Sequence, residues 1–93
     1  MSALTAREAE SRLKNLPGWK IEAGELVRTF QFADFRASLR FVNAVGELAE
    51  QAGHHPDIDI RYNRVRLALI THDAGGLTTK DFDLAGRAQG LTG

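Results

Sequence analysis

The spacing of apolar residues changes twice along this chain, and these changes constrain the fold more than any other feature. After Asp34, apolar residues recur at helical spacing as far as Ala52, which predicts a long helix capped by Asp34. Residues 19–32 and 57–70 instead alternate apolar and polar residues, a pattern typical of β-strands. The predicted helical stripe comprises Phe35, Leu39, Val42, Val45, Ala49 and Ala52, with Phe41 and Leu48 on a second flank.

Two further helices are expected, one before the first hairpin and one after the second. Thr5 and Glu8 have the spacing of a capping box, and Thr78 and Asp81 repeat this logic later in the chain. The order α-β-β-α-β-β-α predicts an α+β fold with a four-stranded antiparallel sheet covered by three helices. We expect a single domain that spans residues 1–93.

The three histidines of the chain flank the second predicted hairpin: His54 and His55 come just before its first strand, and His72 just after its second. Asn63-Arg64 is a plausible two-residue turn, because asparagine tolerates a positive φ. With that turn, His55 lies directly opposite His72, and the two Cα atoms are roughly 4.5–5.5 Å apart. The register therefore predicts that His54, His55 and His72 meet at the open end of this hairpin.

A group of histidines suits general acid–base chemistry near neutral pH. A neutral imidazole, with a reference pKa of ~6.5, can accept or donate a proton in that range. Two such groups can divide the work, one protonating a leaving oxygen while the other removes a proton elsewhere. We therefore take His54, His55 and His72 as candidate catalytic residues.

Neighbouring residues are candidates for supporting roles. Glu50 precedes His54 by one helical turn and would share its face, but Gly53 is a natural helix terminator that would separate them. Asp81 can cap its own helix and also contact His72, and Pro56 restricts the residue before it to extended geometry.

A metal centre is the competing interpretation of the same cluster. The three histidines, with Glu50 or Asp81, offer ligands that zinc or iron would accept. Adjacent residues on an extended segment point in opposite directions, however, so His54 and His55 do not readily share one ion. The sequence therefore favours a site without a metal.

The composition excludes several other classes of function. Twelve Lys and Arg balance twelve Asp and Glu, so no overall field attracts nucleic acid or an acidic membrane. The absence of cysteine rules out disulfides and thiolate metal ligands. No apolar run is long enough for a membrane span or a signal sequence, so we expect a cytoplasmic location without membrane or nucleic-acid partners.

Taken together, the spaced residues resemble the signature of the pterin-4a-carbinolamine dehydratases. The matching positions are Glu50, His54-His55-Pro56, Tyr62, His72 and Asp81. The resemblance extends to Gly18-Trp19, to the aromatic region from Phe30 to Phe41, and to the segment from Thr71 to Thr78. Ile58 departs from the pattern, because animal members carry tryptophan there.

The resemblance implies a function and a role for each matching residue. Family members dehydrate 4a-hydroxytetrahydropterin to quinonoid dihydropterin in pterin recycling, without a metal or an organic cofactor. By similarity, His54 and His72 form the acid–base pair, His55 holds the pterin, Glu50 orients a histidine or the substrate, and Asp81 supports His72. Relatives are homodimers or homotetramers. Some relatives act instead as coactivators or assembly scaffolds, so a non-catalytic role is the alternative.

Overall fold

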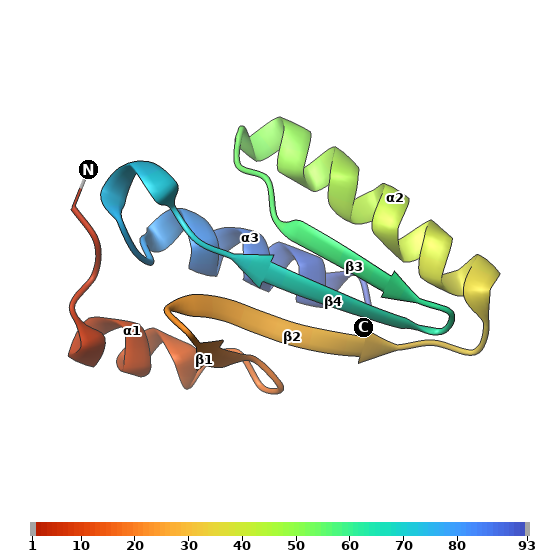
Figure 1. Cartoon of the computed structure of the whole chain (residues 1–93), viewed down its shortest axis with the longest axis horizontal. Helices are drawn as coiled ribbons and strands as arrows, with labels where there is room; N and C mark the ends of the chain where they lie inside the picture. The colour runs from red at the N-terminus through yellow and green to blue at the C-terminus, as the bar shows by residue number, and fades with distance from the viewer. Residues whose placement is uncertain (1, 93) are drawn as a thin grey trace.

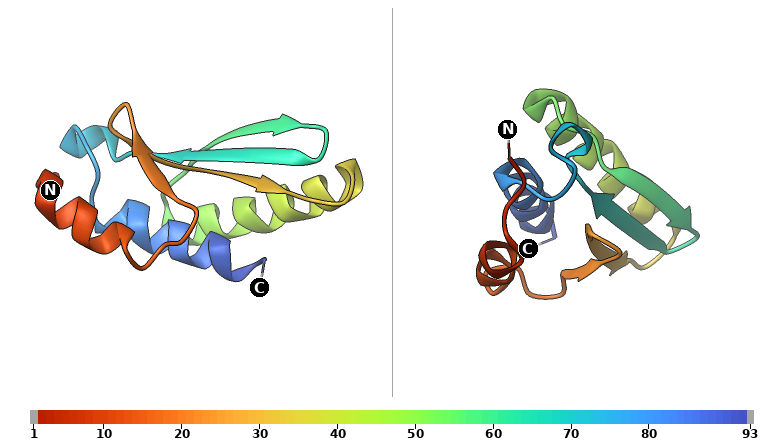
Figure 2. Two further views of the ribbon diagram at one scale, coloured as in Figure 1. Left: turned by 90° about the horizontal axis from the view of Figure 1, so that it is seen from below. Right: turned by 60° about the vertical axis from the view of Figure 1, so that its left-hand side comes forward.

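The computed structural model describes residues 2–92 and has the predicted order of elements. Four antiparallel strands form one sheet in the order β1-β2-β4-β3, and the three helices lie together on one side of it (Figures 1 and 2). The α+β prediction is therefore confirmed. The elements are α1 (Ala6–Leu13), β1 (Lys20–Glu22), β2 (Glu25–Gln31), α2 (Phe35–Ala52), β3 (Asp57–Arg61), β4 (Arg64–Leu69), the short 3₁₀ helix η1 (His72–Ala74) and α3 (Thr79–Gly90).

Both predicted capping boxes are present and fix the starts of α1 and α3. The Thr5 hydroxyl accepts from the Glu8 backbone N–H at 3.1 Å, and the Glu8 carboxylate accepts from the Thr5 N–H at 2.9 Å. The hydrogen bond that the Thr5 backbone N–H donates to the Glu8 carboxylate is the main cause of the lowered pKa of Glu8. Thr78 and Asp81 make the corresponding pair at the start of α3. This second capping box also fixes the side chain of Asp81, a residue of the candidate site.

The core lies between the sheet and the helices and is rich in aromatic contacts. Phe30 of β2 stacks at a tilt on Phe41 of α2, with ring centroids 4.6 Å apart, and meets Trp19 edge-on at 5.8 Å. Arg28 interrupts the inner face of β2 between the buried residues Leu26 and Phe30. Its guanidinium lies over the Phe30 ring and donates to the Pro17 carbonyl oxygen, so its charge is satisfied at the rim of the core.

The stripe that α2 buries differs from the predicted one. The residues that face the sheet and α3 are Ser38, Phe41, Val45 and Ala49, whereas Phe35 and Leu39 are 46% and 39% exposed. The helix is apolar on two adjoining flanks, and periodicity alone does not say which flank meets the sheet. Phe41 decides this, because it packs on both Phe30 and Phe32. The flank with Phe35 and Leu39 remains open.

The predicted register of the second hairpin is wrong by two residues. The turn is Tyr62-Asn63, because Arg61 pairs with Arg64, and Tyr62 has the positive φ of 53° that we expected of asparagine. A shift of two residues keeps each side chain on its predicted face. It also means that His55 does not lie opposite His72, since the same register continued beyond the strands would set His55 opposite Ile70.

The first hairpin turns at Ala23-Gly24, and the strain of this turn can be tested by substitution. Glu22 pairs with Glu25, and both central residues have positive φ, 52° at Ala23 and 80° at Gly24. Asn-Gly is the favoured pair for such a turn. We expect Ala23→Asn to raise the free energy of unfolding by about 0.5–1 kcal/mol in urea denaturation. Ala23→Val should lower it, and the reverse order of the two variants would contradict the assignment of strain to Ala23.

Candidate active site

The C-terminal cap of α2 aims His54. Gly53 adopts the left-handed conformation (φ 63°), and its N–H donates to the carbonyl oxygen of Glu50. The next N–H, that of His54, reaches back to the carbonyl oxygen of Ala49, which completes a Schellman motif. The helix therefore stops before His54, as the glycine predicted, and the chain turns sharply towards β3. This turn carries the His54 side chain away from the helix face that holds Glu50.

His54 is held by Asp81 of α3. Its Nε2 atom lies 2.5 Å from Oδ1 of the carboxylate. The Asp81 side chain is fully buried and that of His54 is only 11% exposed, so water weakens this contact little. The resemblance assigned Asp81 to the support of His72, and the structure corrects that assignment: the partner is His54. The contact depends on how α3 packs against the end of α2, which residue spacing does not reveal.

The partners of Asp81 identify which ring nitrogen of His54 carries a hydrogen. Oδ2 of Asp81 accepts from the Thr71 hydroxyl and from the Thr78 backbone N–H, both at 2.9 Å. Oδ2 thus acts as an acceptor only, and in an ionised carboxylate Oδ1 is an acceptor as well. His54 must then donate through Nε2. Within residues 2–92 its Nδ1 has no hydrogen-bond partner, so this atom can exchange a proton with a molecule bound beside the ring.

His55 turns to a different partner. Its Nε2 lies 2.5 Å from Oε2 of Glu50, and both side chains are exposed. Glu50 thus contacts a histidine as the sequence suggested, but the partner is His55 and not His54, which follows Glu50 by four residues. The two adjacent histidines pair with carboxylates on different helices, because neighbouring side chains of an extended segment point apart. An exposed pair of this kind orients a ring more than it stabilises the fold.

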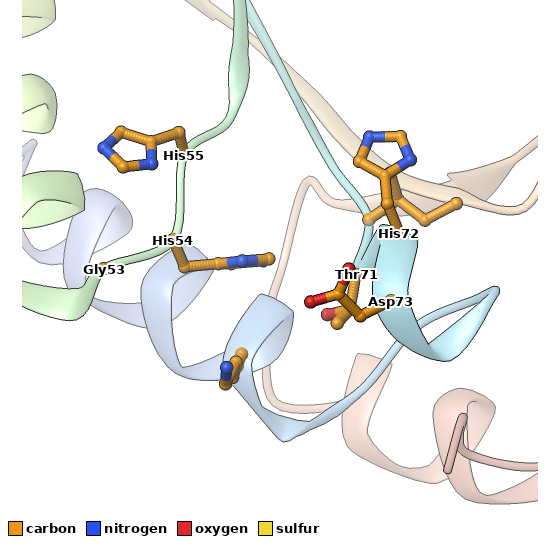
Figure 3. Close-up of a pocket in the computed structure, with 8 residues that line it drawn as sticks. Gly53, His54, His55, Thr71, His72 and Asp73 are labelled. Carbon is orange, nitrogen blue, oxygen red and sulfur yellow. The ribbon is translucent and has the colours of Figure 1, made fainter. Parts of the chain in front are cut away.

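The three histidines border one pocket of about 270 Å³. Figure 3 shows Gly53, His54 and His55 on one wall and Thr71, His72 and Asp73 on the other. His72 is exposed and begins η1, a turn held by hydrogen bonds between Thr71 and Gly76. The structure therefore brings the histidines together, but across a pocket rather than as directly opposed neighbours in a ladder.

Two further residues line this pocket that the sequence did not point to. Lys80 and Ile70 also line the pocket. The capping box gave a signal for Lys80, because it places that residue just before Asp81 in the first turn of α3. The bond from Thr71 to Asp81 depends on tertiary structure, which spacing does not reveal.

The side chains of the site are not arranged as a metal centre. Within residues 2–92, no group of three or more His, Asp or Glu side chains is placed to hold a metal ion. The carboxylates of Asp81 and Glu50 each contact a different histidine.

None of the helices within residues 2–92 has the length and apolar character of a membrane-spanning segment.

The fold and the site together define a class: an α+β protein with a histidine-rich pocket suited to proton transfer. A sequence model of the family described as pterin 4 alpha carbinolamine dehydratase matches residues 2–91, and the chain belongs to this family. The resemblance seen in the sequence is thereby confirmed.

Bacterial relatives match the chain along almost its whole length. A protein of Acidobacterium capsulatum is 62% identical over 91 residues, which cover 98% of this chain and 99% of the relative. One from Chloroflexus aurantiacus is 57% identical over 93 residues, with both chains covered completely. Both are provisionally named pterin-4-alpha-carbinolamine dehydratases.

Two solved structures share the fold. The crystal structure of a transcriptional coactivator/pterin dehydratase from Brucella melitensis superposes with a TM-score of 0.95 at 32% identity, covering 99% of this chain and 100% of that one. A pterin dehydratase-like protein described as a RuBisCO assembly factor in the alpha-carboxysome gives a TM-score of 0.66 at 24% identity, covering 81% and 87%. The second likeness concerns the fold alone.

Proposed function

We propose that this protein dehydrates a 4a-hydroxytetrahydropterin to the quinonoid dihydropterin and water by histidine acid–base catalysis. The observation that carries the proposal is the bond between His54 and the buried Asp81 at the wall of a pocket that also holds His55 and His72. Membership of the family supplies the class of substrate. The proposed reaction takes place in pterin recycling and uses no metal or organic cofactor.

The proposed chemistry needs one proton delivered and one removed. Protonation of the 4a-hydroxyl oxygen lets the C4a–O bond break and release water. The neighbouring ring nitrogen forms a double bond to C4a with its lone pair, and the ring then loses a proton. His54, through Nδ1, and His72 are the two groups that exchange these protons. His55, steadied by Glu50, contacts the pterin ring, and Pro56 keeps the backbone of His55 extended.

A direct assay distinguishes this proposal from a non-catalytic role. The 4a-hydroxytetrahydropterin is generated in situ, and its decay is followed by ultraviolet absorbance with and without the protein. We expect the wild-type protein to accelerate the decay, and the double variant His54→Ala/His72→Ala to leave it at the rate in buffer. A wild-type protein without effect would reject the dehydratase and favour a scaffold or assembly role.

We also propose that the protein self-associates through strand β3. This strand lies at the edge of the sheet, and exposed large apolar side chains lie on or beside it and on α2: Phe35, Leu39, Ile58 and Tyr62. Antiparallel pairing of two β3 strands about a two-fold axis at Ile60 would set Asp59 opposite Arg61 of the partner subunit, twice. It would also bring Ile58 near the β3–β4 turn of the partner subunit, where Tyr62 is exposed. The charges and the apolar side chains are thus self-complementary in this register.

Charge reversal tests this pairing. Asp59→Arg leaves two positive side chains at these positions and Arg61→Asp leaves two negative ones, so each variant alone should shift towards monomer in analytical ultracentrifugation. An equimolar mixture should recover the wild-type assembly, because opposite charges then face each other. Variants that each retain the wild-type mass would contradict the register, and a monomeric wild-type protein would contradict self-association.

A further inference from the structure

Thr71 stands between the two halves of the candidate site. Its hydroxyl donates to Oδ2 of Asp81 at 2.9 Å, and Asp81 in turn holds His54. Its backbone N–H and C=O bond to Gly76 and so close the loop that begins with His72. Thr71 is buried, and Figure 3 shows it next to His72 in the pocket wall opposite His54. One residue thus connects the support of one histidine to the turn that carries another.

The donor and the acceptor of each hydrogen bond around Thr71 can be assigned in only one way. An ionised carboxylate can only accept, so the single hydroxyl hydrogen of Thr71 is committed to Asp81. The bond of 2.8 Å between the Thr71 and Thr78 hydroxyl oxygens must then use the hydrogen of Thr78. Thr78 accepts in turn from the backbone N–H of Lys80 at 3.3 Å. Each group in this chain therefore donates to the next: the Lys80 N–H to Thr78, Thr78 to Thr71, and Thr71 to Asp81. Asp81 also accepts from His54.

We infer that Thr71 is a positioning residue, which fixes the His54 ring through Asp81 and sets its distance from His72. The inference rests on the proposed function for its rate measurement only. A chain of bonds with a defined direction allows one orientation of the carboxylate, and that orientation allows one orientation of the imidazole. Thr71 touches no reacting atom in this account and acts through its neighbours.

The test exchanges the hydroxyl for a methyl group of similar size. In Thr71→Val, we expect kcat to fall roughly 10- to 100-fold with little change in KM, because the pocket keeps its shape while the His54 ring loses its fixed position. Thr71→Ser retains the hydroxyl and should recover most of the lost activity. Thr79→Val makes the same chemical change at an exposed neighbouring threonine and should behave as wild type.

A second readout does not depend on activity. In nitrogen-15 NMR spectra of the free protein, the Nε2–H of His54 should be protected from exchange with water in wild type, Thr71→Ser and Thr79→Val, and should lose that protection in Thr71→Val. An unchanged signal in Thr71→Val overturns the inference, whether or not activity falls, and so does a Thr71→Ser variant as defective as Thr71→Val. If the wild type proves inactive but the signals follow the expected pattern, the proposed function fails and the positioning role stands.

Discussion

Substitution of His54 or His72 by alanine is expected to lower kcat for carbinolamine dehydration by about 10²–10⁴-fold, the contribution of one well-placed acid or base. His54 is confined by Asp81 at the pocket wall, and His72 lies on the opposite wall. Removal of either ring takes away one of the two proton-transfer groups. Steady-state rates on generated 4a-hydroxytetrahydropterin measure the loss directly.

The two substitutions should differ in stability, which separates catalysis from folding. His54→Ala leaves the buried Asp81 carboxylate without one of its donors, at a cost of about 1–3 kcal/mol. His54→Gln keeps an N–H that can reach this carboxylate, and should be the more stable of the two yet equally inactive. His72 is exposed, so His72→Ala should unfold within about 0.5 kcal/mol of wild type. A His54→Gln protein with wild-type kcat would remove His54 from the mechanism.

Asp81→Asn is expected to abolish most of the activity although it removes no group that touches the substrate. The Thr71 and Thr78 donors keep the amide oxygen at the position of Oδ2, so the amide NH₂ group faces His54. His54 must then accept through Nε2 and carry its hydrogen on Nδ1. A comparable change of tautomer in serine proteases costs about 10⁴-fold in kcat, and we expect 10²–10⁴-fold here.

The expected tautomer change can be seen independently of the rate. Nitrogen-15 shifts of the His54 ring should show the hydrogen on Nε2 in wild type and on Nδ1 in Asp81→Asn. Asp83→Asn is the matched control, because it makes the same change at an exposed position of the same helix. Wild-type kcat in Asp81→Asn, or equal losses in both variants, would show that the buried carboxylate does not act through His54.

The order of elements could be predicted from the sequence because each depends on local chemistry. The capping residues Thr5, Asp34 and Thr78 mark the starts of the three helices, and Gly53 marks the end of α2. The turn of the second hairpin could not be placed, since Tyr62 takes a positive φ that its side chain does not favour. The rest of the hairpin imposes this strain, and local preference pointed to Asn63.

The histidines and carboxylates of the candidate site could be predicted from the sequence, but not which carboxylate contacts which histidine. His54, His55, His72, Glu50 and Asp81 are all recognisable from spacing, and the fold brings the three histidines to one pocket. Which carboxylate holds which histidine depends on how α3 packs against the end of α2, a contact between distant parts of the chain. The assignment of Asp81 to His72 failed for this reason.

The pH dependence of kcat tests histidine acid–base catalysis most directly. For the wild-type protein, we expect a rate well above that in buffer, with at least one inflection between about pH 5 and 8, where histidines titrate. The inflection should be lost or displaced in His54→Gln and in His72→Ala. A profile without an inflection in this range, or one that neither substitution alters, would contradict the account.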